Sequence, residues 1–266
     1  MRIKCVILTV VFISLSGLTA ADKSDSLSIG PQFHLETSFG ASGIKGDNIS
    51  FGTTIPLYKT YNDANKTKLA TPGNIDFQLI NAIESRKSIR KFDTGELTFK
   101  EISTILLTAD GITHERNGIA MRSAPSGGAL YPIEIYLYAH AINSLEQGLY
   151  HFQVSDSSLE FIKSGDFNAD FHEFANNQNS VGASPATIIL TARFDRSTRK
   201  YADRGYRYTY MEGGAICQNI YLACTALNLG TVSVGAFDDD RLNEFLAVDG
   251  LHEAALLIFP IGRPTP

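Results

Sequence analysis

Residues 123–138 read SAPSGGALYPIEIYLY. The first half is a proline among small residues and glycines, and the second half is an apolar, aromatic run typical of a buried strand. The residues just before the buried strand therefore have small side chains or none. A tight turn accounts for such a segment by itself. The alternative is a bound molecule against the main chain, because the bare N–H and C=O groups of Pro125, Ser126, Gly127 and Gly128 suit the edge of a planar heterocycle.

Regular structure is predicted on both sides of this stretch. Thr98 and Glu101 form a capping box that starts a helix, and this helix is expected to end at Gly111. Further helices are expected near residue 76 and over residues 170–177, 207–228 and 238–248, and strands over residues 133–142, 148–154, 158–164, 186–194, 232–237 and 254–262. Helices and strands interleave, but a hairpin and uneven spacing speak against a doubly wound sheet. The predicted fold class is α+β, in one domain.

The first 21 residues, MRIKCVILTVVFISLSGLTAA, have the layout of a secretory signal peptide. Arg2 and Lys4 precede an uncharged stretch that ends in two alanines. Export is therefore expected, to the periplasm if the source is bacterial, and the alternative is an N-terminal anchor that is not cleaved. Residues 22–70 are polar and show no sustained period. We expect an extended arm there and the folded domain over residues 71–266.

The composition argues against several classes of function. A net charge of −5 gives no reason to expect a nucleic-acid partner. The six histidines are scattered without metal-ligand spacing, so no metal site is expected. Cys217 and Cys224 lie in one predicted helix, where seven residues rise about 10 Å, beyond the roughly 7 Å that a disulfide spans. Both cysteines are expected to be buried thiols.

Two further segments suit an anion or a flat ring. In SRKSIRKF, residues 85–92, an extended backbone points Arg86, Ser88 and Arg90 the same way, which would form a phosphate cradle. The alternative is a basic complement to the C-terminus of the preceding helix. In SVGAFDDD, residues 233–240, the amides of Gly235 and Ala236 could donate to a ligand atom.

Gly213 and Gly214 are expected in the interior of the long helix, where each costs about 1 kcal/mol relative to alanine. Glycine is tolerated there when another backbone or a ligand approaches closely. A twin helix from a second subunit would supply that reason. A kink in the helix is the alternative.

Taken in order, these segments resemble the nitroreductase superfamily of FMN-dependent oxidoreductases, and within it the thiazole/oxazole-forming azoline dehydrogenase branch. The likeness covers nearly all of the chain after residue 33. It rests on FHLET, IPLYKTY, SRKSIRKF, APSGGALYPIEIY, KYADRGYRY, EGGAICQNIYLACTALNLG, VGAFDDDRL and IFPIGRP. The resemblance implies a homodimer with FMN in the interface and the long helix near the two-fold axis.

The resemblance also implies roles for individual residues. It places Pro125, Ser126, Gly127 and Gly128 against the flavin ring, Arg86 and Ser88 on the FMN phosphate, Arg90 near the pyrimidine edge, Gly235 or Ala236 at flavin N5, and Arg263 at the phosphate. A positive charge near the pyrimidine edge would stabilise the anionic reduced flavin.

Lys200 and Tyr201 are the catalytic candidates. In the azoline-oxidising branch a Lys-Tyr pair at this place is the proposed base that removes a proton as hydride leaves to FMN. A lysine desolvated near an arginine can lose its proton and act in this way. The alternative is that residues 196–208, RSTRKYADRGYRY, form a basic surface segment.

The expected function is therefore an FMN-dependent oxidoreductase that moves hydride between a small-molecule or peptide substrate and flavin N5. Azoline dehydrogenases work in the cytosol beside a cyclising partner, whereas this chain is expected to be exported, where NAD(P)H is scarce. NAD(P)H is accordingly a weak candidate for the electron donor. The alternative is an exported, non-catalytic protein that binds flavin or a partner on the same fold.

Overall fold

The computed structural model describes residues 28–39, 55–73 and 75–265, so the expected signal peptide and part of the expected arm lie outside the described residues. Contacts divide the chain into two units, residues 1–48 and residues 49–266. The first unit contains helix α2 (Ile29–Glu36), and the second contains all other elements described below. Within the described ranges, no helix is long and apolar enough to cross a bilayer.

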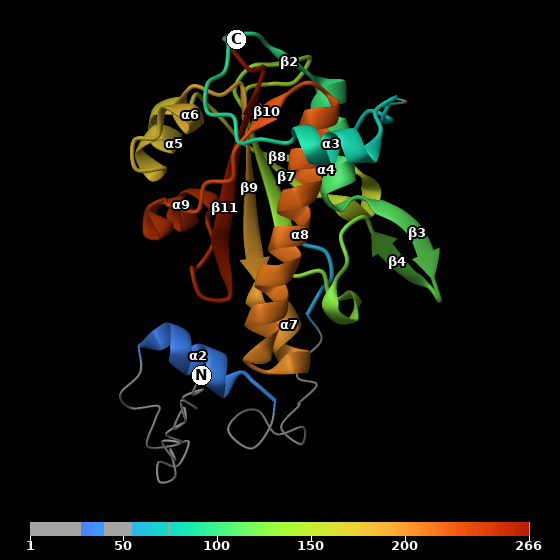
Figure 1. Ribbon diagram of the computed structural model, residues 1–266, viewed down its shortest axis with the longest axis vertical. Coiled ribbons are helices and arrows are strands. Elements are labelled where there is room, and N and C mark those ends of the chain that lie inside the picture. The colour runs from blue at the N-terminus through green and yellow to red at the C-terminus, as the bar shows by residue number, and fades with distance from the viewer. Residues whose placement is uncertain (1–27, 40–54, 74, 266) are drawn as a thin grey trace, which may run out of the picture. The chain divides into compact units, whose positions relative to one another are not determined.

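A seven-stranded sheet forms the centre of the second unit (Figure 1). Its strand order is β1-β8-β7-β5-β9-β11-β10, and all neighbouring pairs are antiparallel. The strands are β1 (Lys66–Lys68), β5 (Ile133–Ala139), β7 (Gly148–Gln153), β8 (Ser158–Ser164), β9 (Ala186–Arg193), β10 (Gly230–Thr231) and β11 (Glu253–Gly262). Strand β1 brings the last part of the expected arm into the sheet. The sheet and its helices confirm the α+β fold class.

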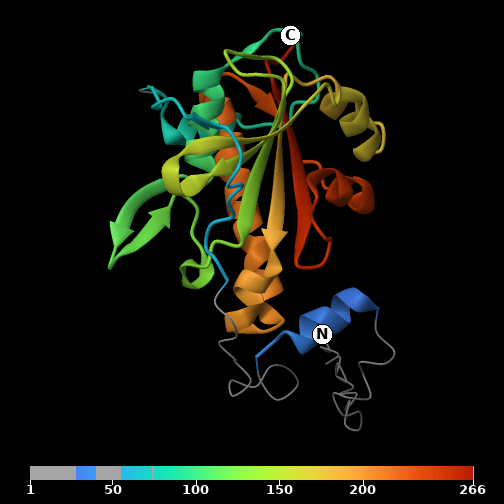
Figure 2. The ribbon, with the colours of Figure 1, turned by 180° about the vertical axis from the view of Figure 1, so that it is seen from behind.

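Helices cover both faces of this sheet, as Figures 1 and 2 show from opposite sides. One face carries α3 (Leu79–Ser85), α4 (Phe99–Asp110) and α8 (Arg204–Ala226), and the other carries α5 (Asn168–Phe174), α6 (Asn179–Gly182) and α9 (Asp239–Leu246). Helix α7 (Phe194–Tyr201) connects β9 to α8. Because both faces are covered, all seven residues of β5 are buried, with Ile135 and Leu137 toward α8 and Tyr136 and Tyr138 toward α5.

Two small sheets complete the fold. Strand β2 (Leu97–Thr98) pairs with β6 (Ile142–Asn143) in parallel, and β3 (Ile112–Arg116) pairs with β4 (Ile119–Arg122) as a hairpin. Neither strand of this hairpin is among the strands expected from the sequence. The sequence did contain a signal for the hairpin, the dipeptide Asn117-Gly118. Both residues take positive φ, 53° and 76°, as a two-residue hairpin turn of this kind requires.

Local signals account for several element boundaries. Thr98 accepts a hydrogen bond from the Glu101 amide at 3.2 Å and donates to its carboxylate, so the predicted capping box is confirmed, and α4 ends before Gly111. Asp238 caps α9 in the same way. The expected strand over residues 232–237 is wrong, because only Val234 makes a bridge there, to Ile258.

Candidate active site

The glycine loop, Pro125–Ala129, is a short turn that holds the chain in unusual backbone conformations. Gly128 has φ +68°, and Ala129 and Tyr131 have φ 53° and 46°, where non-glycine residues are strained. The loop is fixed from within, because the hydroxyl of Ser126 accepts a hydrogen bond of 2.8 Å from the Tyr131 amide. Strained main chain held in this way is typical of functional sites.

The predicted catalytic pair lies against this loop. A Cβ atom on Gly128 would come within 2.6 Å of the Tyr201 hydroxyl and 2.7 Å of the Lys200 amine. A larger residue at this position would therefore displace the ends of both side chains. The ring of Tyr201 packs edge-on against that of Tyr208 at a centroid distance of 4.8 Å. The basic segment over residues 196–208 is thus not a plain solvated surface, since its Lys200 and Tyr201 converge on the glycine loop.

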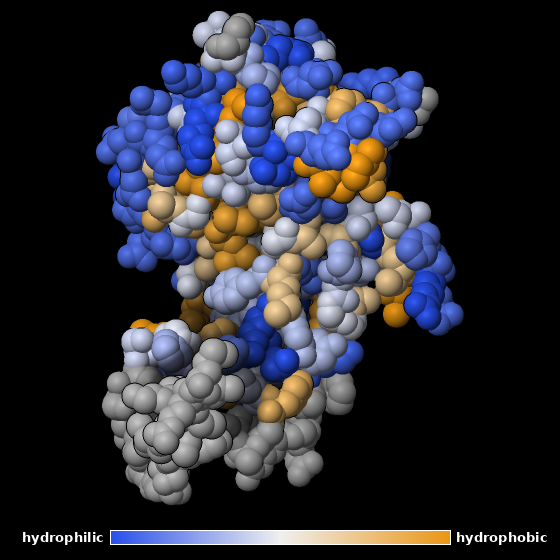
Figure 3. All heavy atoms as spheres, in the orientation of Figure 1, coloured by the Kyte–Doolittle hydropathy of each residue, from blue (hydrophilic) through white to orange (hydrophobic). Residues whose placement is uncertain are grey.

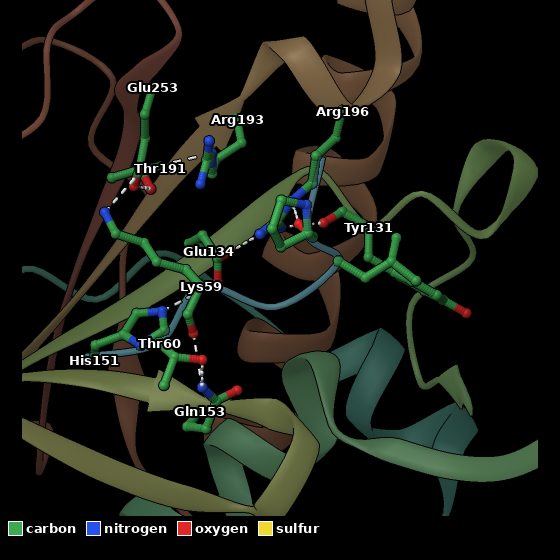
Figure 4. Close-up of polar contacts among 12 residues, drawn as sticks. Lys59, Thr60, Tyr131, Glu134, His151, Gln153, Thr191, Arg193, Arg196 and Glu253 are labelled. Atoms are coloured by element: carbon green, nitrogen blue, oxygen red, sulfur yellow. Dashed lines mark hydrogen bonds and ion pairs between the residues drawn. The ribbon is translucent and has the colours of Figure 1, made fainter. Parts of the chain in front are cut away.

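Arg196 ties helix α7 to the residues that follow the glycine loop. Its side chain is fully buried and donates to the carbonyl oxygens of Pro56 at 2.9 Å and Tyr131 at 2.8 Å. It also donates to the carboxylate of Glu134 at 2.5 Å, as Figure 4 shows. Because Lys200 lies one helical turn after Arg196, the same arginine positions the lysine and the loop that the lysine contacts.

A chain of charges extends from this arginine across the sheet. His151 lies between Glu134, 3.1 Å from its Nε2, and Glu160, 2.9 Å from its Nδ1, and Glu160 also pairs with Lys66. Burial alone would lower the pKa of His151, but the hydrogen bonds to both glutamates outweigh it and raise the pKa. Burial likewise opposes ionisation of Glu134, yet the charge of Arg196 and the bond to His151 hold its pKa at about 2. The row alternates in sign from Lys66 to Arg196.

A second buried polar group lies beside this row (Figure 4). Lys59 donates to Glu253 at 2.8 Å and to the Tyr136 hydroxyl at 2.6 Å, and Thr191 donates to Glu253 at 2.8 Å. The sequence analysis did not identify this group or the row of charges beside it. For the row a signal was available, because Glu134, His151 and Glu160 each lie between apolar residues of a predicted strand, where a buried charged group requires a partner.

On the side of the glycine loop that faces α8 there is a cavity of about 300 Å³, which we call the Glu212 cavity. Its lining consists of Pro125, Ser126, Gly127, Tyr208, Met211, Glu212 and Ala215. Glu212 is 4% exposed, and its Oε1 has no hydrogen-bond partner among the described residues. Burial raises the pKa of Glu212 to about 8, and a hydrogen bond with Ser126 opposes that rise. Sequence reasoning missed this residue, since a glutamate in a helix is usually exposed.

The predicted phosphate residues lie farther along α8. The guanidinium of Arg86 is 5.1 Å from the ring centroid of Tyr221, and the Ser88 hydroxyl is 3.1 Å from the Tyr221 hydroxyl. The Tyr221 hydroxyl also accepts a bond of 2.8 Å from the Ser233 amide. Arg86 and Ser88 thus point to one side, as their spacing predicts. Neither Arg86 nor the exposed Arg90 has a carboxylate within 4.0 Å among the described residues, so both charges are available to an anion.

The remaining predicted site residues are Gly235, Ala236 and Arg263. Gly235 and Ala236 are exposed in the turn after Val234, and the Ala236 carbonyl accepts a bond from Gln178. Arg263 forms an ion pair of 3.1 Å with Glu101, so its charge already has a partner at the start of α4.

The site residues therefore fall into two groups on one helix. The glycine loop meets α8 at Tyr208 and Glu212, whereas Arg86 and Ser88 meet it at Tyr221. At 1.5 Å per residue, these contact points are roughly 14–20 Å apart along the helix. A single chain therefore holds these residues in two separate groups and does not bring all the predicted residues together.

Comparisons with known proteins agree with the fold. Residues 83–263 match the family model of the nitroreductase family. The chain belongs to the nitroreductase family. Its resemblance to the azoline-forming branch is borne out as well, because the Microcin B17-processing protein McbC of Escherichia coli is 25% identical over 259 residues, 92% of this chain and 93% of McbC.

Two further proteins that this chain resembles are named as nitroreductases. The Methanocaldococcus jannaschii protein named "Putative nitroreductase MJ1384" is 36% identical over 196 residues, 74% of this chain and 96% of that protein. A crystal structure titled "putative nitroreductase", from Anabaena variabilis, superposes with a TM-score of 0.70 at 25% identity and covers 88% of this chain and 46% of that one. This nitroreductase-family chain has the fold of flavin oxidoreductases.

Proposed function

We propose that this chain is an FMN-dependent oxidoreductase whose substrate loses or gains a hydride and a proton at the glycine loop. The observation that carries the proposal is the convergence of Lys200 and Tyr201 on Gly128. Bound FMN would supply N5, the atom that accepts or returns the hydride. Lys200 and Tyr201 would hold or remove the substrate proton, so that the substrate is oxidised by two electrons in all.

The residues present fit FMN in two ways. Arg86 and Ser88 face the same side beside Tyr221 and offer a cation and a hydroxyl to a phosphate. The glycine loop offers bare main chain beside a cavity, where the nearest neighbours of a Cβ atom on Gly127 would be the side chains of Tyr208 and Tyr201, in ordinary contact at 3.7 and 3.8 Å. The chain therefore offers FMN both an anion site for its phosphate and a surface for the face of its ring.

We further propose that two copies of the chain complete each site. Helix α8 exposes Met211 and Gly214, and a Cβ atom on Gly214 would have no neighbour within 4 Å. If two α8 helices cross antiparallel near Gly214, Tyr208 of one copy lies opposite Tyr221 of the other, because the two tyrosines are six and seven residues from Gly214. The phosphate half-site of one copy then meets the glycine loop of the second.

Apolar surface supports this pairing. Leu79, Ile80 and Ile83 of α3 are 65%, 55% and 48% exposed, and they form a hydrophobic patch that Figure 3 shows over α3. These three side chains face outward from α3, the helix that contacts α8. An exposed apolar patch of this kind is typical of a protein interface.

The relation to McbC over 92% of this chain favours a substrate of the azoline type within a peptide. Export through residues 1–21 stays a prediction, and we propose it together with an electron partner other than NAD(P)H. The alternative, a non-catalytic flavin-binding protein, predicts a bound flavin that no substrate reduces.

The test separates cofactor binding from chemistry. The purified protein should take up FMN, and an anaerobic screen of reductants and azoline peptides should bleach its visible flavin absorbance. Arg86→Ala should weaken FMN retention and leave the bleaching of the remaining bound flavin intact. Lys200→Ala should retain FMN and slow bleaching by substrate. A protein that takes up no FMN, or the reverse pattern in the two variants, contradicts the proposal.

A further inference from the structure

The Glu212 cavity contains a carboxyl group that no cation neutralises. The two arginines nearby are already engaged, since Arg122 pairs with Asp110 at 2.6 Å and Arg196 pairs with Glu134 at 2.5 Å. Glu212 is as deeply buried as these groups but has no ion pair among the described residues. An isolated carboxylate at such a depth is strongly disfavoured, and the usual outcome is that the group keeps its proton.

The charges that face Glu212 come from several elements. Asp110 of α4 raises its pKa, and Arg122 of β4 and Arg196 of α7 lower it, while burial is the largest influence and raises it to about 8. Burial and the lack of an ion pair among the described residues therefore both favour the protonated form of Glu212, which has one donor O–H group.

The hydrogen bonds of the glycine loop leave that donor unused. The Ser126 hydroxyl accepts from the Tyr131 amide at 2.8 Å, so its own hydrogen is available to one carboxyl oxygen of Glu212. The other oxygen, Oε1, has no partner among the described residues. A buried polar group is almost always satisfied, by protein, water or ligand. Since Glu212 lines the cavity beside the bare main chain of Pro125 and Gly127, the missing partner belongs in that cavity.

We propose that Glu212 acts as a neutral carboxylic acid that donates a hydrogen bond to an uncharged acceptor at the edge of the flavin ring. The inference rests on the proposed function, because it requires the ring against the glycine loop. An ionised Glu212 would present a negative charge to acceptor atoms, so ring binding requires the proton. Donors and charges at the ring edge are among the means by which a protein tunes a flavin.

The protonation state can be measured without any ligand. In protein labelled with ¹³C at the glutamate carboxyl carbons, the infrared spectrum at neutral pH should contain the C=O band of a protonated glutamic acid. Glutamate-specific labelling excludes Asp110, whose pKa burial also raises, to about 7. The band should vanish in Glu212→Gln and persist in Glu173→Gln, a matched control at an exposed position of α5. Its absence from the wild-type protein overturns the inference.

Ligand binding provides the second arm, with riboflavin as the probe because it lacks the phosphate that titrates in FMN. Fluorescence quenching should show that the riboflavin Kd of the wild-type apoprotein rises above pH 8, by about tenfold per pH unit, as ionised Glu212 must regain its proton. Glu212→Gln, which is always neutral and keeps an N–H donor, should bind with little dependence on pH. Glu212→Ala, which has no donor at this position, should bind riboflavin more weakly than Glu212→Gln at every pH.

The outcomes separate the two proposals. Riboflavin binding with the same pH dependence in the wild type and in Glu212→Gln overturns the role of Glu212 and leaves the oxidoreductase proposal standing. If the wild type and both variants bind neither riboflavin nor FMN, the proposed function fails, and the role of Glu212 fails with it.

Discussion

Substitution of Gly128 by alanine tests the contact between the glycine loop and the catalytic candidates. The new Cβ would lie 2.6 Å from the Tyr201 hydroxyl and 2.7 Å from the Lys200 amine, so both side chains must move. The backbone adds a second cost, because φ is +68° and alanine in the left-handed region is less stable than glycine by roughly 1–2 kcal/mol. At about 2–4 °C per kcal/mol for a domain of this size, Tm should fall by roughly 2–8 °C.

Two matched variants separate the backbone effect from the contact. Gly118→Ala carries the same kind of strain at φ +76° but has no neighbour within 4 Å, so it should lower Tm to a similar extent. Gly127→Ala has its nearest neighbours at 3.7 Å and no positive φ, so its stability should change by less than about 0.5 kcal/mol. Only Gly128→Ala should displace Lys200.

The assay combines thermal melting with acylation of lysine amines, measured by mass spectrometry of the peptide that carries Lys200. Gly128→Ala should change the acylation rate of Lys200, while Gly118→Ala and Gly127→Ala should leave that rate at the wild-type value. With a substrate identified, turnover should fall most in Gly128→Ala, since a displacement of about 1 Å can cost about 100-fold. Equal Lys200 labelling in Gly128→Ala and Gly118→Ala would refute the contact.

Three further predictions concern stability, each measured by chemical denaturation. Because the pKa of Glu212 is raised from 4.5 in the unfolded chain to about 8 in the fold, its stabilising contribution is complete below pH 4.5 and is lost as the pH rises to about 8. Between pH 5 and pH 8, the free energy of unfolding of the wild type should therefore fall by on the order of 2–5 kcal/mol more than that of Glu212→Gln. Equal decreases in the two proteins would contradict this. Arg196→Met should cost about 3–5 kcal/mol, because it removes one of the two cations that pair with the buried Glu134; a change near zero would contradict the buried pair. Thr98→Ala should cost about 1 kcal/mol by removing the cap of α4, and an unchanged stability would contradict the capping box.

Local patterns were sufficient to predict much of the fold. The capping box at Thr98, the hairpin of β7 and β8, and the apolar runs of β5 and β9 each carry their signal within a few residues. The outward face of α3 could not be predicted in the same way, because helical spacing shows that Ile80 and Ile83 share a face but not what covers it.

The site was predictable only in its parts. The sequence indicates that Gly128 leaves main chain bare, and the resemblance singles out Lys200, but only the fold brings residues 72 positions apart into contact. The partners of Glu134 come from α7 and β7, so its role depends on long-range packing that no local pattern encodes. The separation of the two half-sites along α8 likewise follows from three-dimensional structure alone.

The central claim is that each flavin site is shared by two copies of this chain, and the FMN content of a mixed dimer tests it most directly. Arg86→Ala damages the phosphate half-site and Gly127→Phe fills the cavity beside the glycine loop, so both homodimers should retain far less FMN than the wild type. A mixed dimer purified through two different affinity tags combines the intact half of each chain and should retain one FMN, against two for the wild-type dimer. A mixed dimer that retains no more FMN than its parents would contradict the shared site.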